Sequence, residues 1–274
     1  MGELVEGDDG LPVEEVGAWA KDKHQSLSRY VDISRGVRSK WLDPGKAGAT
    51  YIDLFCGPGR AKVRRTGEFI DGSCVAAWNA SLNGGTPFSE VIIADADDER
   101  RDLAAQRLRR LKAPVIEVGG DAANSIHAVM SRLKPQGLHF AFLDPYNLAS
   151  FDFCVMQELA KLKYIDILVH VSKMDLQRNL GINVKAQQSA FDMFAPGWRS
   201  AVDLRQSQPA IRRDVFSFWK QKVANLGIGA STDMELITGS RGQHLYWLTL
   251  VARHQLAHAF WKVASNKSKQ GSLF

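Results

Sequence analysis

The sequence predicts an α/β protein built on a mostly parallel sheet, and three observations support this fold class. The chain has 274 residues, of which 45% are apolar, so it can bury a full core of this kind. Short apolar runs alternate with stretches that carry apolar residues at helical spacing, as in parallel strands joined by helices. Beyond residue 172 this alternation stops, and the last strands form a hairpin pattern. One large domain with additions is therefore expected.

The first predicted element is a helix over residues 13–41, where apolar residues recur three and four positions apart. It ends at Asp43-Pro44-Gly45, a helix-breaking sequence. Strands are then predicted at 50–55, 90–94, 114–118, 139–143 and 166–171. Helices fit between them at 72–82, 98–111, 122–133 and 151–162. The hairpin is expected from 234–238 and 245–252, with its turn at 239–243.

These elements divide the chain into three parts. Residues 1–48 form an acidic segment and a helix, and residues 49–264 form the main domain. Within that domain, residues 173–230 are expected to be a basic, helical insertion. Residues 265–274 are expected to be a frayed tail.

Composition excludes several classes of protein. No stretch of eighteen apolar residues occurs, and the N-terminus lacks the basic and apolar regions of a signal peptide, so we expect a soluble, cytoplasmic protein without a membrane partner. The three cysteines form no C-x-x-C pair, which argues against both a disulfide framework and structural zinc. His254 and His258 are four residues apart, but Gln255 replaces the glutamate of a zincin motif and no third ligand is evident. No metal is predicted.

Charge is distributed unevenly along the chain. Residues 1–20 contain six acids and no Lys or Arg, and because the whole chain carries +5, the remainder carries +11. Basic residues gather at 60–65, 199–222 and 253–269. Such a distribution suits a polyanion such as DNA or RNA, although a solvated basic face has the same composition.

A glycine turn follows the first predicted strand, in the sequence Tyr51 to Arg60. Open α/β sheets bind ligands at the carboxyl ends of their strands, and glycines there allow the backbone to approach a ligand. The third glycine of a dinucleotide fingerprint is missing, and no Gly-Lys-Ser/Thr follows. A tight turn without a ligand is the alternative. The candidate ligand-binding residues of this turn are Asp53, Phe55, Cys56, Gly57, Pro58 and Gly59.

An acid stands at the carboxyl end of each of the first four predicted strands: Asp53, Asp95, Asp121 and Asp144. A single acid after a strand is usually a helix cap. Four in succession favour a nucleoside-type ligand, in which Asp95 accepts the ribose hydroxyls and Asp121 meets an adenine amine. Ala96 and Ala122 follow two of these acids and complete the candidate cofactor site. S-adenosylmethionine fits all four positions.

Two motifs resemble those of S-adenosylmethionine-dependent methyltransferases. D-L-F-C-G-P-G resembles their first motif, with Phe in place of the first glycine, and L-D-P-Y resembles the D/N-P-P-Y/F motif of enzymes that methylate exocyclic amines. Five parallel strands followed by an antiparallel hairpin also resemble the class I plan. The resemblance implies a Rossmann-like class I methyltransferase fold with a mixed seven-stranded sheet flanked by helices.

Longer stretches resemble one narrower family, the three-Cys-motif partner proteins (TcmP). The matching residues are Lys23-His24, Leu27, Tyr30, Tyr51-Ile52-Asp53, Gly57-Pro58-Gly59-Arg60, Gly72-Ser73, Leu143-Asp144-Pro145-Tyr146, Asp175, Arg178 and Phe191 to Trp198. The family implies a bacterial methyltransferase-like protein whose partner carries a three-cysteine motif. It does not supply a substrate.

The L-D-P-Y motif suggests amine methylation. An aromatic amine is a poor nucleophile, and Asp144 with the carbonyl of Pro145 could accept its protons while Tyr146 stacks on the base. The sequence has one proline where the family motif has two, so a simple strand-ending turn with a packed tyrosine remains the alternative. These three residues are the catalytic candidates.

Other residues are substrate-binding candidates. Arg60 to Arg65 are expected to form a basic loop that grips phosphates or closes as a lid, unless it is merely solvated. Asp175 and Arg178 either bind substrate or pair with each other, and Lys23 and His24 either turn toward the site or form a surface pair. The full set is Lys23, His24, Arg60, Arg64, Arg65, Asn147 and Arg178.

The sequence leaves three functions open. The protein either methylates an amine or similar nucleophile on a nucleic acid, or it binds nucleic acid without catalysis, or it docks a protein partner through the basic face at 199–222.

Overall fold

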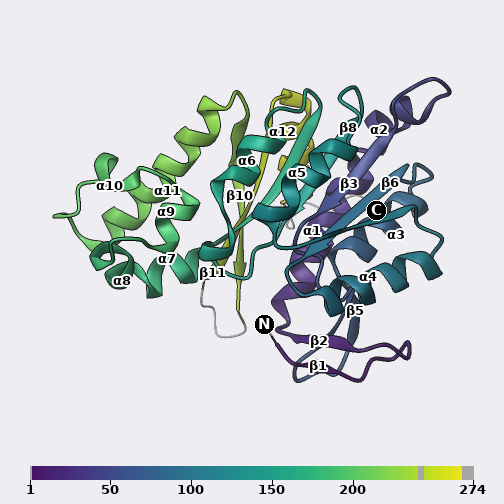
Figure 1. The fold of residues 1–274 in the computed structure, drawn as a ribbon, viewed down its shortest axis with the longest axis horizontal. Helices are drawn as coiled ribbons and strands as arrows, with labels where there is room; N and C mark the ends of the chain where they lie inside the picture. Colours follow the sequence, from purple (N-terminus) through teal and green to yellow (C-terminus); the bar gives the residue numbers. More distant parts are fainter. Residues whose placement is uncertain (1, 240–243, 267–274) are drawn as a thin grey trace.

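The computed structural model describes residues 2–239 and 244–266 and is built around one large sheet (Figure 1). The strand order is β10-β11-β9-β8-β3-β6-β7. Five strands are parallel, and β10 and β11 form an antiparallel hairpin beside β9. The strands are β3 (Ala49–Asp53), β6 (Glu90–Asp95), β7 (Val115–Gly119), β8 (Leu138–Leu143), β9 (Ile165–Ser172), β10 (Gly229–Thr238) and β11 (His244–Ala252). The predicted fold class is confirmed. Residues 240–243 of the predicted turn and 267–274 of the predicted tail lie outside the described residues.

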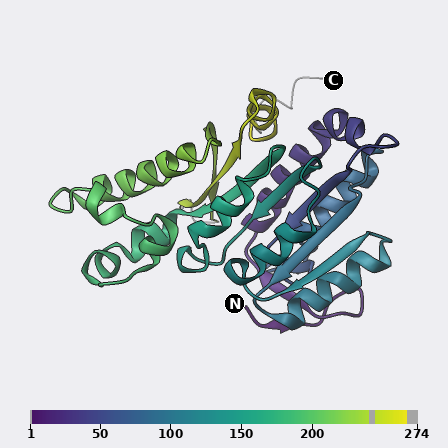
Figure 2. The same ribbon diagram turned by 45° about the horizontal axis from the view of Figure 1, so that its top comes forward.

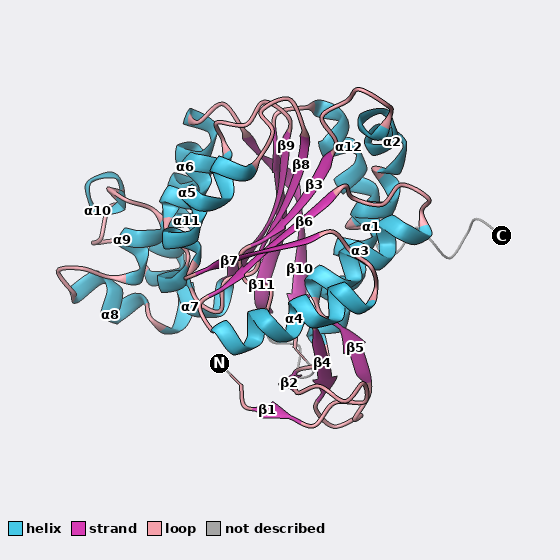
Figure 3. Ribbon diagram, turned by 45° about the vertical axis from the view of Figure 1, so that its right-hand side comes forward, coloured by secondary structure: helices cyan, strands magenta, loops and turns pink. Residues whose placement is uncertain are grey.

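Helices cover both faces of this sheet (Figure 3). One face is covered by α1 (Trp19–Ile33), α2 (Arg35–Leu42), α3 (Ser73–Asn83), α4 (Asp98–Arg110) and α12 (Gln255–Ala264). The other face is covered by α5 (Ala122–Arg132), the short η1 (Leu148–Ser150), α6 (Phe153–Leu159) and α11 (Gln208–Asn225). Because both faces are covered, strands such as β3 are buried at every position, so apolar residues occur on both faces of the strand.

The segment of the chain between β9 and β10 is mainly helical. Its helices are α7 (Lys173–Arg178), α8 (Leu180–Lys185), α9 (Ala190–Phe194), α10 (Trp198–Ala201) and α11. Figure 2 shows this group projecting from one end of the sheet. Its core is aromatic, because Trp219 stacks against Phe194 with ring centroids 5.2 Å apart and against Phe216 at 5.8 Å. Arg199, part of the predicted basic face, donates instead to Asp192 and to backbone carbonyls within the group.

The expected helix over residues 13–41 is wrong at its start. Residues Val13–Val16 form strand β2 of a second sheet, whose order is β1-β2-β4-β5. The other strands of this sheet are β1 (Leu4–Val5), β4 (Arg60–Val63) and β5 (Phe69–Asp71). Val13 and Val16 are three residues apart, a spacing that suits a helix, but residues 14–16 pair with β4 and so form a strand. The helical part is divided into α1 and α2 at Ser34.

The acidic N-terminal segment folds back onto basic residues of the main domain. Asp8 pairs with Arg60 at 2.6 Å, Asp9 with Arg107 at 2.7 Å, and Glu14 with Arg100 at 3.0 Å. Arg107 also donates to the carbonyl of Pro58 at 2.6 Å, which ties the segment to the glycine turn. The two charge blocks that stand apart in the sequence therefore partly neutralise each other in the fold.

No helix in residues 2–239 and 244–266 is long and apolar enough to cross a membrane. Within the same ranges, no group of three or more His, Cys, Asp or Glu side chains is arranged to hold a metal ion.

Candidate active site

The glycine turn follows β3, as the sequence predicts, and its backbone contacts the end of β6. The amide of Cys56 donates to the carbonyl of Ala94 at 3.1 Å, and the amide of Gly57 donates to Asp95 at 2.9 Å. Gly57 and Gly59 both have left-handed backbones, with φ of 53° and 78°. A Cβ on Gly59 would stand 3.0 Å from the Cα of Ala104, so the packing against α4 also requires this glycine. A Cβ on Gly57 would meet open space except for the Glu14 carboxylate at 3.9 Å.

Asp95 and Asp53 support the turn from two sides. Asp95 is 8% exposed, and its second oxygen accepts the amide of Asp97 at 3.0 Å. Burial raises its pKa, while the two amides oppose that shift. Asp53 is fully buried beneath the turn, where it accepts the amide of Phe55 at 3.2 Å and the hydroxyl of Tyr51 at 3.1 Å. Burial raises the pKa of Asp53 to about 7.

The remaining cofactor candidates have varied surroundings. Asp121 is exposed and caps α5, because its carboxylate accepts the amide of Asn124 at 2.9 Å. Ala122, which follows it, is buried, whereas Ala96 is exposed beside Asp95. Phe55 is half-buried, and Pro58 is buried.

Asp144 lies at the centre of a buried ionic cluster. One of its oxygens contacts the ammonium of Lys23 from α1, and the other lies 2.6 Å from Nδ1 of His170 on β9. Lys23 and His170 side chains are each 6% exposed, and Asp144 is 16% exposed. Burial alone would raise the pKa of Asp144, but Lys23 and His170 outweigh it and hold that pKa well below its usual range.

Three further polar atoms around this cluster are buried and make no hydrogen bond within the described part of the chain. They are Nε2 of His170, Nδ1 of His24 and the hydroxyl of Tyr246. Burial lowers the pKa of His24 to about 4, so its ring is neutral near pH 7. Tyr246 packs edge-on against His170, with ring centroids 3.9 Å apart. Buried polar atoms without partners are costly in a folded protein and mark places where a ligand or water can bind.

The residues after Asp144 form a rim that hydrogen bonds hold in place, with one projecting side chain. Pro145 is buried, whereas Tyr146 is 70% exposed. Asn147 accepts the amide of Ser150 at 2.9 Å and so caps η1. Asp175 accepts the amide of Leu148 at 2.8 Å, which fixes the rim to α7. Tyr146 therefore projects from this edge toward solvent.

Several substrate candidates have structural contacts instead. Arg60 is not in a loop but in β4, where it pairs with Asp8 and, at 2.8 Å, with Asp71. The predicted mobile loop at residues 60–65 is wrong, because residues 60–63 pair with β2 and β5.

The other basic candidates are solvent-exposed. Arg64 and Arg65 are exposed, and Arg64 donates to the carbonyl of Glu15 at 3.2 Å. Arg178 is exposed and, within the described ranges, forms no ion pair with Asp175, whose carboxylate accepts from Leu148 and Asn179 instead. The alternative in which Asp175 pairs with Arg178 is therefore wrong.

Two residues of the Asp144 cluster were not predicted. His170 is the single ionisable residue near the end of the apolar run Ile167–Val171, and that interruption is the signal which could have identified it. Tyr246 carries no such signal, because a tyrosine in a strand is ordinary, and only the pairing of β11 with β9 brings it to His170.

Comparison with known proteins supports the fold and does not identify the substrate. No family model and no curated protein matches the chain. Among solved structures, the DszA carbon methyltransferase matches with a TM-score of 0.50 and 11% identity, over 86% of this chain and 54% of its own. A candidate O-methyltransferase from Klebsiella pneumoniae matches with 0.47 and 14%, over 89% and 83%. A candidate RNA methyltransferase from Pyrococcus horikoshii matches with 0.41 and 11%, over 87% and 89%.

Other solved neighbours contain a bound cofactor or sinefungin. The sheet order and the match to the DszA carbon methyltransferase together establish that the chain has a class I methyltransferase-like fold. Identities this low show the fold alone.

Proposed function

We propose that the protein binds S-adenosylmethionine and methylates an amine or similar nucleophile on a nucleic acid. The observation that carries this proposal is the placement of the Asp144 cluster beside the glycine turn, at the carboxyl edge of the sheet where class I folds react. Unpartnered buried atoms on His24, His170 and Tyr246 support a ligand at this place.

The residues of the turn fit S-adenosylmethionine. Asp95 has lone pairs left after it accepts the amides of Gly57 and Asp97, so it can accept ribose hydroxyls. The backbone at Gly57 is open toward the ligand side, because no protein atom lies closer than the Glu14 carboxylate to a Cβ built there. When bound, S-adenosylmethionine supplies an electrophilic methyl group.

The chain's own residues would position the nucleophile and manage its proton. Asp144 Oδ1 would accept an N–H of the substrate amine, and His170, which contacts the same oxygen, would take up the proton that the amine loses. Lys23 holds the other oxygen and fixes the carboxylate in place. Tyr146 would stack on a base that has left its duplex or belongs to a single strand.

Replacing Tyr146 with alanine tests the stacking role. Tyr146 is 70% exposed, so the free energy of unfolding should change by less than about 0.5 kcal/mol. Base–aromatic stacking contributes about 1–3 kcal/mol, so kcat/KM for a nucleic-acid substrate should fall by about 5- to 150-fold. Tyr146→Phe keeps the ring and should retain activity. Equal activity of the alanine variant and wild type would remove Tyr146 from the site.

The overall activity is tested by transfer of a labelled methyl group to single- and double-stranded DNA and RNA. Incorporation that requires Asp144 is the expected result. A second candidate function is a binding module without catalysis, which is favoured by one observation: Lys23 and His170 already occupy both oxygens of Asp144. Retained cofactor and nucleic-acid binding without any transfer would establish that second function.

The resemblance to three-Cys-motif partner proteins adds a proposed protein partner. Such a partner would carry a three-cysteine motif, and the basic residues of 199–222 that remain on the surface are the candidate contact. Co-purification of a cysteine-motif protein, lost when Arg213 is replaced by glutamate, would support this partner.

A further inference from the structure

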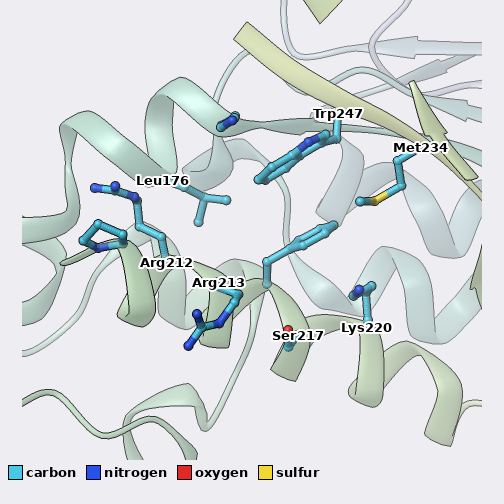
Figure 4. A pocket seen from close by; sticks show the side chains of 10 residues that line it. Leu176, Arg212, Arg213, Ser217, Lys220, Met234 and Trp247 are labelled. Carbon is cyan, nitrogen blue, oxygen red and sulfur yellow. The ribbon is translucent and has the colours of Figure 1, made fainter. Parts of the chain in front are cut away.

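We propose that a second binding site, on the opposite face of the sheet from the Asp144 cluster, holds one nucleotide of a single-stranded nucleic acid. The structure has a pocket of about 400 Å³ between α7, α11 and the β10–β11 hairpin. Figure 4 shows Arg212 and Arg213 on one side of this pocket, Lys220 on the other, and Trp247 along its edge. Pockets of this size accommodate a small ligand.

One face of α11 supplies the positive side of the pocket. Arg212, Phe216 and Lys220 are spaced four residues apart and so lie along the same face of the helix. Lys173 of α7 completes the set, and no carboxylate is among the described residues that line the pocket. Arg213 has an ion pair with Asp214 at 3.1 Å, and the Lys173 ammonium lies 2.7 Å from Nδ1 of His244. Within residues 2–239 and 244–266, Arg212 and Lys220 form no ion pair. The pocket therefore favours an anion.

The apolar wall of the pocket favours a flat group as well. Phe216 and Trp247 lie nearly parallel, with ring centroids 5.0 Å apart and an interplanar angle of 19°. Met234 and Leu176 extend this wall. A phosphate alone would leave the apolar wall unused, and an apolar ligand would leave the cations unused. A nucleotide, with a planar base and a phosphate, uses both.

The position of the pocket connects it to the candidate active site. Trp247 follows Tyr246 in β11, so these two side chains point to opposite faces of the same sheet edge. Lys173 begins α7 directly after β9, the strand that carries His170. Tyr246 and His170 belong to the Asp144 cluster, while Trp247 packs on the α11 side. A single-stranded nucleic acid with one nucleotide held in the pocket could cross this sheet edge and bring a neighbouring nucleotide to Asp144. In this respect the inference rests on the proposed function.

Fluorescence anisotropy with a labelled oligothymidylate of about ten nucleotides tests the site, without cofactor. Arg212→Gln and Lys220→Gln should each weaken binding about tenfold and reduce the salt slope by about 0.7. Trp247→Leu should weaken binding about 5- to 150-fold, because stacking is lost. Lys40→Gln, an exposed cation on α2, is the matched control and should leave affinity unchanged. Thermal unfolding verifies that each variant is folded.

Competition identifies the ligand. Thymidine monophosphate should displace the strand at least about tenfold better than thymidine or inorganic phosphate alone. Tighter binding of the nucleic-acid strand than of the mononucleotide supports the proposal, whereas equal binding indicates a free nucleotide as the ligand and overturns the strand. Displacement by phosphate as effective as by the nucleotide, or better displacement by a glutamate-rich peptide, overturns the proposal.

The two proposals fail separately. Nucleotide binding that depends on Arg212, Lys220 and Trp247, without methyl transfer, would overturn the proposed function and leave this site standing. If these substitutions change neither methyl transfer nor nucleic-acid binding, the proposed pocket site is overturned and the proposed function still stands.

Discussion

Asp144→Asn is expected to abolish methyl transfer and to lower the free energy of unfolding by about 3–5 kcal/mol. The substitution removes the negative charge that both Lys23 and His170 contact, and it leaves Lys23 buried without a counter-charge. Breaking a buried ion pair by removing one partner typically has this cost. Urea unfolding near pH 7 measures the stability, and labelled methyl transfer measures the activity.

A double variant separates the structural role of Asp144 from its chemical role. Lys23→Met combined with Asp144→Asn removes both charges, so a large part of the lost stability should return. Methyl transfer should not return, because the acceptor for the amine proton is still absent. Full activity of Asp144→Asn would contradict the amine mechanism, and unchanged stability would contradict the buried ion pair.

Asp53→Asn is expected to flatten the pH dependence of stability. The folded protein holds a proton on Asp53 up to about pH 7, whereas the unfolded chain releases it near pH 4. Between these values the folded state binds more protons, so stability falls as pH rises and the loss is complete above about pH 7. The difference of about three between the folded and unfolded pKa of Asp53 corresponds to roughly 4 kcal/mol of stability, at about 1.36 kcal/mol per pKa unit.

Urea unfolding between pH 4 and pH 8 measures this effect. Burial also raises the pKa of Asp166, to about 6, and Asp166→Asn is the matched control, since it should remove a smaller part of the same slope. Asp144 has the opposite sign, because its depressed pKa gives stability that is lost only in stronger acid. An Asp53→Asn variant with the wild-type slope would show that the Asp53 carboxyl is ionised in the folded state.

The main sheet could be predicted because its signals are local. Each parallel strand is a short apolar run, and each crossover helix has its own periodicity and caps, such as Asp97 and Asp121. The observed boundaries of these elements differ from the predicted ones by a few residues. The largest difference is at β10, which begins five residues before its predicted start. The hairpin of the class I plan could also be predicted, because its turn signal and its alternation of apolar and polar residues are local.

The second sheet could not be predicted because its pairing is long-range. β2 and β4 are separated by more than forty residues, and neither has an alternating pattern long enough to identify a strand. The same distance hides the ion pairs of Asp8 with Arg60 and of Asp9 with Arg107. The sequence therefore predicts that Arg60 binds a nucleic acid, although in the fold its ion pair with Asp8 anchors the N-terminal segment.

The part of the candidate site that could be predicted consists of the residues at the ends of strands. Asp53, Asp95, Asp121 and Asp144 all lie at or just beyond the carboxyl ends of parallel strands, as expected. Their environments differ in ways that the sequence does not reveal: Asp53 is buried, Asp121 is an exposed cap, and Asp144 is held by Lys23 and His170. These differences depend on side chains delivered by other elements.

The central claim is that the glycine turn and Asp95 bind S-adenosylmethionine, and calorimetric titration tests it most directly. The purified protein should bind S-adenosylmethionine and S-adenosylhomocysteine. Asp95→Ala should weaken both by at least about tenfold, and Asp98→Ala, three residues further on in α4, should not. Thermal unfolding verifies that both variants are folded. Binding of neither ligand by the wild-type protein, or equal binding by Asp95→Ala, would contradict the account.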